Sequence, residues 1–297
     1  MEAAHLAGRI LIGLVGAGIR TSLSPPLHER EADLQGLRYL YQVIDIDELG
    51  LPVGATGDLL VAARRLGFRG LNITHPCKQV ALGHVDELSP DAAAIGAVNT
   101  VVWSGGVSIG YNTDWSGFTQ SFERGLPGAS LENVVLLGAG GAGAAVAHAV
   151  LWLGAERLTV VDADARRAAA LVDALAARFG ADRVGGGGRE LTEACLGEAD
   201  GLVNATPVGM TGHPGVPLPL GLLRPELWVA DIVYRPLETE LLLHARRLGC
   251  RTLGGGEMVV FQAAEAFRLF AGVAPDAERM LRHFRSLTTV DAGAGGA

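Results

Sequence analysis

The chain contains a single lysine, Lys78, among 24 basic residues, so arginine supplies nearly all of the positive charge. Arginine keeps its proton near neutral pH, whereas lysine can release one when its surroundings lower its pKa. Lys78 follows Asn72, Thr74 and His75 in a turn-like stretch, which makes it a candidate acid or base. The alternative is that Lys78 is an ordinary surface residue of an arginine-rich protein.

Other scarce features exclude several classes of protein. The three cysteines, Cys77, Cys195 and Cys250, are far apart and form no CxxC pair, which predicts a reducing cytoplasm, no disulfide framework and no metal site. The net charge of −8 argues against nucleic acid or an anionic membrane as partner. No apolar run is long enough to span a bilayer, and the N-terminus lacks the pattern of a signal peptide. We therefore expect a cytoplasmic protein, either a monomer or a homodimer.

Length and composition favour two α/β domains. The 297 residues, 49% of them hydrophobic, are enough for two domains with sizeable cores. In the first half, strands and helices alternate in a way that predicts a mostly parallel sheet covered by helices. The expected strands are residues 10–15, 39–46 and 69–74, the expected helices are residues 27–35 and 58–66, and a hairpin is expected around residues 96–114.

A second alternation begins near residue 131. We expect strands at residues 134–137, 157–161, 201–205, 228–233 and 251–253, with helices at residues 138–153, 165–179, 258–272 and 277–287. The expected domain boundary is the stretch 117–130. The predicted organisation is a substrate-binding and catalytic domain (1–117, with helices 258–290 packing back on it) and a Rossmann-type domain (118–257). Residues 291–297, rich in glycine and alanine, are expected to be a disordered tail.

A dinucleotide-binding loop is the clearest motif. Gly138, Gly140 and Gly143 form a GxGxxG pattern between a predicted strand and a predicted helix. The glycines permit a tight turn and close approach of a pyrophosphate, and the helix N-terminus supplies amide donors. Asp162 ends the next strand, where a carboxylate binds ribose hydroxyls and repels a 2′-phosphate, so NAD is predicted rather than NADP. Arg166 and Arg167 lie nearby and leave NADP open. The alternative is a glycine-rich turn without a ligand.

Polar clusters in the first half predict a small polar ligand. They are Ser22 and Ser24, Asn72 and Thr74, Asn99, and residues 112–114, and together they suit a molecule with several hydroxyls and a carboxylate. Each alone is more often a turn or cap former. Residues 16–18 also place glycines after a strand, but no third glycine follows, so we interpret this loop as shaping a substrate pocket.

The sequence resembles the shikimate dehydrogenase family over nearly its whole length. The segments that carry the resemblance are Ser-Leu-Ser-Pro at 22–25, Asn-Ile-Thr-His-Pro-Cys-Lys at 72–78, Gly-Ala-Val-Asn-Thr at 96–100, Asn-Thr-Asp-Trp-Ser-Gly at 112–117, Gly-Ala-Gly-Gly-Ala at 138–142, Asn-Ala-Thr-Pro-Val-Gly-Met at 204–210, Asp-Ile-Val-Tyr-Arg-Pro at 231–236 and Gly-Glu-Met-Val-Val-Phe-Gln at 256–262. The resemblance implies reversible hydride transfer between nicotinamide and C3 of shikimate, with 3-dehydroshikimate as the ketone.

The resemblance also implies a role for each matching residue. Lys78 and Asp114 would form the catalytic pair, with Lys78 as the acid/base. Ser22 and Ser24 would bind the substrate carboxylate. The other residues expected around the substrate are Asn72, Thr74, Asn99, Tyr234 and Gln262. The residues expected around the cofactor are Gly138, Ala139, Gly140, Gly141, Ala142, Asp162, Arg167, Thr206, Val233, Gly255 and Met258.

Departures from the family pattern bear on specificity. Biosynthetic members usually have Asn-Arg-Thr after the second strand of the nucleotide domain, where the arginine binds the 2′-phosphate, but this chain has Asp162-Ala163-Asp164. In this it is more similar to NAD-dependent quinate/shikimate dehydrogenases. The Ser22-Leu23-Ser24 segment instead looks specific for shikimate, so quinate remains open. Arg20 replaces part of the usual Asn-Pro and is either solvated or near the carboxylate.

Three alternatives remain. The first is an NADP-linked biosynthetic shikimate dehydrogenase. The second is a family member with another substrate, such as an aminoshikimate or polyol-acid dehydrogenase. The third is a catalytically silent NAD-binding regulator, which the presence of Lys78 and Asp114 disfavours.

Overall fold

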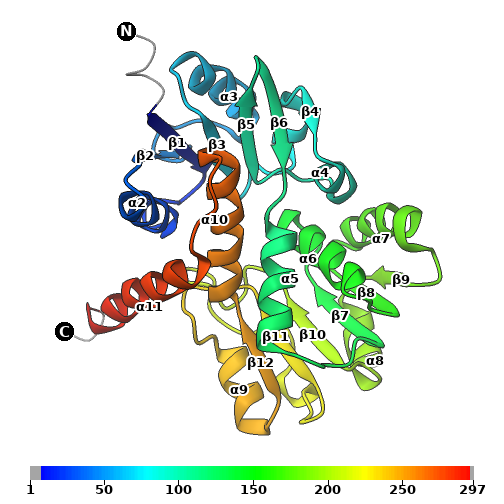
Figure 1. The fold of residues 1–297 in the computed structure, drawn as a ribbon. Coiled ribbons are helices and arrows are strands. Elements are labelled where there is room, and N and C mark those ends of the chain that lie inside the picture. Colours follow the sequence, from blue (N-terminus) through cyan, green and yellow to red (C-terminus); the bar gives the residue numbers. More distant parts are fainter. Residues whose placement is uncertain (1–7, 295–297) are drawn as a thin grey trace, which may run out of the picture. The chain divides into compact units, whose positions relative to one another are not determined.

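The computed structural model describes residues 8–294, which form two compact units (Figure 1). The first comprises the described residues up to Thr113 and from Val260, and the second comprises residues 114–259. The expected boundaries, after residues 117 and 257, lie close to these divisions. None of the described helices is both long and apolar enough to cross a bilayer.

The first unit is built on a six-stranded sheet in the order β2-β1-β3-β5-β6-β4. The strands are β1 (Arg9–Gly16), β2 (Arg38–Asp45), β3 (Gly70–Ile73), β4 (Glu87–Leu88), β5 (Thr100–Ser104) and β6 (Val107–Tyr111). The helices are α2 (Ser24–Leu34), α3 (Thr56–Arg65), α4 (Pro90–Ile95), α10 (Gly255–Ala271, which begins in the second unit) and α11 (Ala277–Ala294). Strands β1, β2 and β3 are parallel, and β5 runs antiparallel to β3 and β6.

Helices cover both faces of this sheet. On one face Ile12 and Leu14 of β1 pack with Ala266 and Phe270 of α10. On the other face Leu71 and Ile73 of β3 pack with residues of α3. Because parallel strands are buried on both faces, β1 is a nearly continuous apolar run, as the sequence predicted.

The second unit is a wholly parallel sheet in the order β12-β11-β10-β7-β8-β9. Its strands are β7 (Asn133–Leu137), β8 (Arg157–Val161), β9 (Val184–Gly187), β10 (Gly201–Asn204), β11 (Trp228–Asp231) and β12 (Arg251–Gly254). Its helices are α5 (Asp114–Gly125), α6 (Gly141–Trp152), α7 (Ala165–Phe179), α8 (Thr192–Gly197) and α9 (Glu240–Leu248). Numbered along the chain within the unit, this order is 6-5-4-1-2-3, the doubly wound dinucleotide-binding arrangement.

Two expectations differ from the structure. The stretch 117–130, expected to contain the domain boundary, lies largely within α5, and the division between the units falls just before that helix. The buried face of α5 repeats with helical spacing through Asp114, Phe118 and Phe122. At the other end of the chain, α11 extends to Ala294, so residues 291–294 are helical, and residues 295–297 of the expected tail lie outside the described residues.

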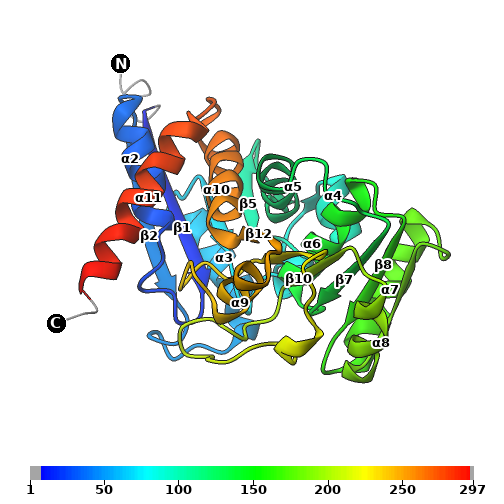
Figure 2. The same cartoon turned by 90° about the horizontal axis from the view of Figure 1, so that it is seen from below.

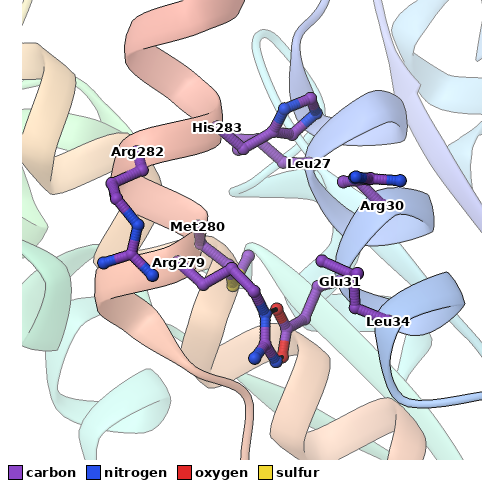
Figure 3. A pocket seen from close by; sticks show the side chains of 8 residues that line it. All are labelled: Leu27, Arg30, Glu31, Leu34, Arg279, Met280, Arg282 and His283. Carbon is purple, nitrogen blue, oxygen red and sulfur yellow. Dashed lines mark hydrogen bonds and ion pairs between the residues drawn. The ribbon is translucent and has the colours of Figure 1, made fainter.

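A buried ion pair joins the first and last helices of the first unit. Figures 2 and 3 show α11 beside α2, with a groove of about 400 Å³ between them. The groove is lined by Leu27, Arg30, Glu31, Leu34, Arg279, Met280, Arg282 and His283. The fully buried Glu31 carboxylate accepts hydrogen bonds from the Arg279 guanidinium at 2.6 and 2.8 Å, from the Gln35 side chain at 2.6 Å and from the Asp276 amide at 2.9 Å. Glu31 therefore anchors the start of α11 to α2.

We predict that Glu31→Ala lowers the free energy of unfolding by about 3 kcal/mol, the usual cost of breaking a buried charged network. The substitution leaves the Asp276 amide, the Gln35 side chain and the Arg279 guanidinium without their shared acceptor. Asp33→Ala, an exposed change on the same helix, is the matched control and should cost little. Urea unfolding measures both, and equal losses for the two variants would contradict the anchoring role of Glu31.

Candidate functional site

A chain of buried hydrogen bonds connects three of the predicted substrate residues within the first unit. The Tyr41 hydroxyl donates to Asn72 Oδ1 at 2.6 Å, and Asn72 Nδ2 donates to Thr100 Oγ1 at 3.0 Å and to the Asn99 carbonyl at 3.3 Å. Thr100 Oγ1 donates in turn to Asn99 Oδ1 at 3.0 Å. The side chains of Asn72 and Asn99 are therefore held in fixed orientations at the end of β3 and the start of β5.

The same chain of hydrogen bonds reaches α10 through Thr113. Asn99 Nδ2 donates to Thr113 Oγ1 at 2.9 Å, and the Thr113 amide donates back to Asn99 Oδ1 at 2.7 Å. Thr113 Oγ1 lies 3.5 Å from Gln262 Oε1 on α10. The structure thus brings Asn72, Asn99 and Gln262 together, although they come from distant parts of the chain. Sequence reasoning missed the supporting hydroxyls of Tyr41, Thr100 and Thr113, because nothing local in the sequence shows which groups they contact.

The predicted carboxylate-binding serines lie in a loop that leaves the same edge of the sheet. Val15 of β1 pairs in register with Ile73 of β3, so the segments that follow these parallel strands begin side by side. Ser22 and Ser24 follow β1, and the Ser24 amide donates to Ser22 Oγ at 3.2 Å where α2 begins. Thr74 follows β3, and its amide donates to the Val15 carbonyl at 2.9 Å. The serine loop and Thr74 therefore share the carboxyl edge of the sheet.

Lys78 lies in the tight segment after β3. Cys77 beside it is fully buried, Lys78 itself is half-buried, and the Val98 amide donates to the Lys78 carbonyl at 2.9 Å, which fixes its backbone. Asp114 is buried at the first position of α5, directly after Thr113. Lys78 belongs to the first unit and Asp114 to the second. Their pairing remains a prediction.

The amides of the glycine loop at residues 16–18 are bound by other parts of the protein. The Ala17 amide donates to the His75 carbonyl at 2.9 Å, and the Gly18 amide donates to Asp45, a residue that sequence reasoning overlooked. Asp45 ends β2, and its carboxylate accepts from the amides of Gly18 at 3.0 Å and Ile19 at 2.7 Å. Burial raises the pKa of Asp45, but these amide donors outweigh it and leave the pKa below its ordinary value. An anion has no free donors here. Arg20 is exposed and pairs with Glu48 at 2.7 Å, in agreement with the solvated interpretation.

The second glycine loop, between β7 and α6, has the geometry of a ligand cradle. Gly138 has φ +101°, and a Cβ at Gly143 would lie 2.0 Å from the Gly138 carbonyl oxygen, so both positions require glycine for the backbone itself. A Cβ at Gly140 would meet no protein atom within 4 Å. The space in front of Gly140, at the N-terminus of α6 with Gly141 and Ala142, is therefore open, as the predicted binding of a pyrophosphate there requires.

Asp162 ends β8 beside this loop. Its carboxylate accepts from the amides of Ala139 at 2.7 Å and Asp164 at 2.8 Å. Asp164 caps α7 and binds the Arg166 guanidinium at 3.2 and 3.3 Å, which lowers the pKa of Asp164. Arg167 is exposed in the first turn of α7. Asp162 thus places negative charge beside the glycine loop, while Arg166 and Arg167 lie nearby.

Two more of the predicted cofactor residues, Thr206 and Val233, depend on a buried network at the ends of β10 and β11. Asn204 Oδ1 accepts from the hydroxyl of Thr206 at 2.7 Å and from its amide at 3.1 Å. Asn204 Nδ2 donates to Asp231 Oδ1 at 3.0 Å, which also accepts from the Val233 amide at 3.0 Å. The positions of Thr206 and Val233 are therefore set by Asn204 and Asp231, to which the sequence alone gave no role.

Three further predicted residues lie in the second unit. A Cβ at Gly255 would lie 2.2 Å from the Ile232 carbonyl oxygen, so glycine is required where α10 begins. Met258 is buried one turn later on that helix. Tyr234 is half-buried, and burial raises its pKa. Within residues 8–294 no group of three His, Cys, Asp or Glu side chains is arranged to hold a metal ion.

Comparison with known proteins identifies the family. A family model described as the shikimate dehydrogenase substrate binding domain matches residues 14–101. A shikimate dehydrogenase (NADP(+)) from Streptomyces avermitilis is 61% identical over 93% of this chain and 95% of its own length. The chain belongs to the shikimate dehydrogenase family. Another relative in this family, a quinate/shikimate dehydrogenase (NAD(+)) from Corynebacterium efficiens, is 48% identical over 94% of this chain and 98% of its own length.

Solved structures of shikimate dehydrogenase family members have the same fold. Quinate dehydrogenase from Corynebacterium glutamicum in complex with NAD matches with a TM-score of 0.86 at 47% identity, covering 94% of this chain and 99% of that one. A shikimate 5-dehydrogenase from Thermus thermophilus in complex with NADP(H) and shikimate matches with a TM-score of 0.80 at 37% identity, covering 93% and 99%. The predicted fold class and the prediction of an NAD(P)-dependent oxidoreductase are confirmed.

We predict that alanine at Gly140 and at Gly143 has opposite effects on stability and binding. Gly143→Ala forces a methyl group against the Gly138 carbonyl and should destabilise the fold by about 1–3 kcal/mol. Gly140→Ala meets no protein atom and should leave stability unchanged while weakening dinucleotide binding about tenfold, or 1.4 kcal/mol.

Thermal unfolding and calorimetric titration with NAD separate the two effects. Full dinucleotide affinity in a normally folded Gly140→Ala protein would contradict the assignment of this loop as the pyrophosphate cradle.

Proposed function

We propose that this protein is an NAD-dependent shikimate 3-dehydrogenase that also accepts quinate. It would interconvert shikimate and 3-dehydroshikimate by hydride transfer at C3. The observation that carries the proposal is the buried chain that aligns Asn72, Asn99 and Gln262 in the first unit, since amide side chains held in this way suit a substrate with several hydroxyls. The names of the relatives, which are shikimate and quinate/shikimate dehydrogenases, support the same substrates.

The substrate carboxylate and ring hydroxyls would be bound by different groups. Ser22 and Ser24 offer two hydroxyls in one loop, and the Ser24 amide already orients Ser22 Oγ. Asn72, Thr74, Asn99, Tyr234 and Gln262 would bind the ring hydroxyls. The 3-hydroxyl is the group that reacts.

Lys78 would act as the general acid/base. During oxidation, hydride leaves C3 while the proton of the C3 hydroxyl passes to the Lys78 amine, and the C–O bond becomes a ketone. The bound dinucleotide supplies the hydride acceptor. Asp114, at the N-terminus of α5, would hold the resulting ammonium and orient the substrate oxygen. Reduction returns the same proton from Lys78 to the oxygen.

NAD is the proposed cofactor because of Asp162. Its carboxylate would accept hydrogen bonds from the adenosine ribose and repel a 2′-phosphate. Arg166 is paired with Asp164, which reduces its availability to a phosphate. The opposing observation is that relatives 61% and 56% identical are named as NADP-dependent, and Arg166 and Arg167 offer cations for that cofactor. An NADP-linked biosynthetic enzyme is therefore the second candidate.

Quinate is included because relatives 48% identical, named quinate/shikimate dehydrogenases, share the NAD specificity proposed here. Quinate carries one more hydroxyl, at C1 beside the carboxylate, so the residue at Ser24 would influence its acceptance. We place the protein in the cytoplasm, where its three free cysteines stay reduced, and the described structure leaves monomer and homodimer open.

We predict that Lys78→Ala lowers kcat by about 10²–10⁴-fold, the usual contribution of a positioned proton-transfer group. Lys78→Arg is the matched variant, because it keeps the positive charge but cannot exchange a proton near neutral pH. Both variants should bind NAD normally in calorimetric titration. Initial rates of shikimate oxidation, followed at the nicotinamide absorbance, measure the effect, and near-normal turnover in Lys78→Arg would show that only charge is needed.

We predict that Asp162→Asn raises kcat/KM with NADP by about tenfold relative to kcat/KM with NAD. The reason is that a hydrogen bond to a charged group contributes about 1.5–3 kcal/mol, and the variant loses the charged acceptor for the ribose. Asparagine removes the charge that would repel a 2′-phosphate, and its single side-chain oxygen can accept from only one of the Ala139 and Asp164 amides, which bind different oxygens of Asp162. The cofactor preference is measured from initial rates of the wild-type protein and the variant, with each cofactor and each substrate. A wild-type preference for NADP would overturn the cofactor assignment.

A further inference from the structure

Asp231 is a buried carboxylate whose hydrogen-bond donors are all neutral. It ends β11 and is 1% exposed. Oδ1 accepts from Asn204 Nδ2 and the Val233 amide, both at 3.0 Å, and Oδ2 accepts from the Thr239 hydroxyl at 2.8 Å. No cation of the described part of the chain forms an ion pair with it.

The burial of this charge is energetically expensive. Burial raises the pKa of Asp231 to about 6, and the three hydrogen bonds oppose that rise only in part. At neutral pH the group is therefore mostly ionised, although an isolated buried anion costs several kcal/mol. An asparagine could accept from the same amides without that cost, so the hydrogen bonds alone do not explain a carboxylate.

Asp231 lies at the edge of the sheet where a dinucleotide would bind. In a doubly wound sheet the dinucleotide crosses the carboxyl edge at the point where strand order reverses, which here lies between β7 and β10. The glycine loop and Asp162 occupy the β7–β8 half, so the other nucleotide half belongs to β10, β11 and β12. Asp231 lies at the carboxyl end of β11 and fixes Val233 directly and Thr206 through Asn204.

We propose that the Asp231 carboxylate is a counter-charge for the oxidised nicotinamide ring and favours binding of the oxidised dinucleotide over the reduced one. The inference rests on the proposed dinucleotide binding by the second unit. The oxidised ring carries a positive charge and the reduced ring does not, whereas the rest of the two cofactors is identical. A nearby carboxylate in a low-dielectric environment therefore distinguishes them by charge.

The preference for the oxidised cofactor should fall with decreasing pH. Above about pH 6 Asp231 is ionised and attracts the oxidised ring, and below it the neutral acid does not. The groups that face Asp231 do not titrate in this range: β10 contributes Asn204, β12 contributes Gly254 in register, and the N-terminus of α9 contributes Thr239. The pH dependence is thus attributable to Asp231 itself.

The test is the ratio of the dissociation constants of NADH and NAD⁺, measured by calorimetric titration without substrate between pH 5 and pH 8. In this ratio, the contribution of any group that affects the two affinities equally cancels. We expect the wild-type ratio to rise about fivefold from pH 5 to pH 8, which corresponds to a downward shift of one pKa unit in Asp231 on binding NAD⁺. Asp231→Asn should make the ratio small and independent of pH.

Two further variants make the result specific. Asp200→Asn, the same change at the amino edge of the same sheet, should keep the wild-type pH dependence, because the Asp200 carboxylate accepts from the Asn133 amide at the edge opposite Asp231. Thr239→Ala removes a hydrogen bond that stabilises the carboxylate, so the midpoint of the pH dependence should move upward.

The outcomes separate this inference from the proposed function. A ratio that is flat with pH in the wild-type protein, or a pH dependence that persists in Asp231→Asn, would overturn the role of Asp231 while leaving dinucleotide binding intact. Failure of both cofactors to bind would overturn the proposed function as well. A midpoint in Thr239→Ala that equals the wild-type value would also contradict the assignment, even if Asp231→Asn does not fold.

Discussion

In each sheet, the carboxyl edge of the parallel strands depends on one interaction, a carboxylate at the end of a strand that accepts hydrogen bonds from the amides of nearby loops. Asp45 fixes the loop after β1, Asp162 fixes the loop after β7, and Asp231 fixes the segment after its own strand, β11. Loop amides at the end of a buried strand need partners, because an unpaired buried donor is costly. The same bonds place the candidate binding residues, which lie on those loops.

This shared interaction produces different outcomes in the two units. In the first unit the Asp45 carboxylate takes the loop amides, and a Cβ at Gly16 would lie 2.3 Å from Thr74 Cγ2, so the loop is packed against protein. In the second unit Asp162 takes only the Ala139 amide of its loop, and the space before Gly140 is open. A glycine-rich turn after a strand is therefore no evidence of a ligand until the packing around it is known.

In this acidic chain, individual ion pairs and buried charges matter more for binding than the net charge does. Arginine forms structural pairs such as Arg279 with Glu31 and Arg166 with Asp164, whereas the only lysine lies beside the polar cluster of the first unit. The buried Asp231 has no such ion pair among the described residues. A net charge of −8 thus says little about binding an anionic cofactor, because the electrostatics of a site depend on a few nearby groups.

The sequence by itself determined the two α/β units, the glycine loop with Asp162, and the family, because strand and helix periodicity and short motifs are local properties of the chain. It did not predict α5, because the domain boundary was expected in the stretch 117–130. Only the tertiary structure decided which polar residues support one another, since Tyr41, Asn72, Thr100, Asn99, Thr113 and Gln262 meet through hydrogen bonds between distant segments. It also decided that Asp45 occupies a loop and that Asp231 is buried among neutral donors. Burial and hydrogen-bond partners depend on which strands are neighbours, and that order is set by packing of the whole sheet.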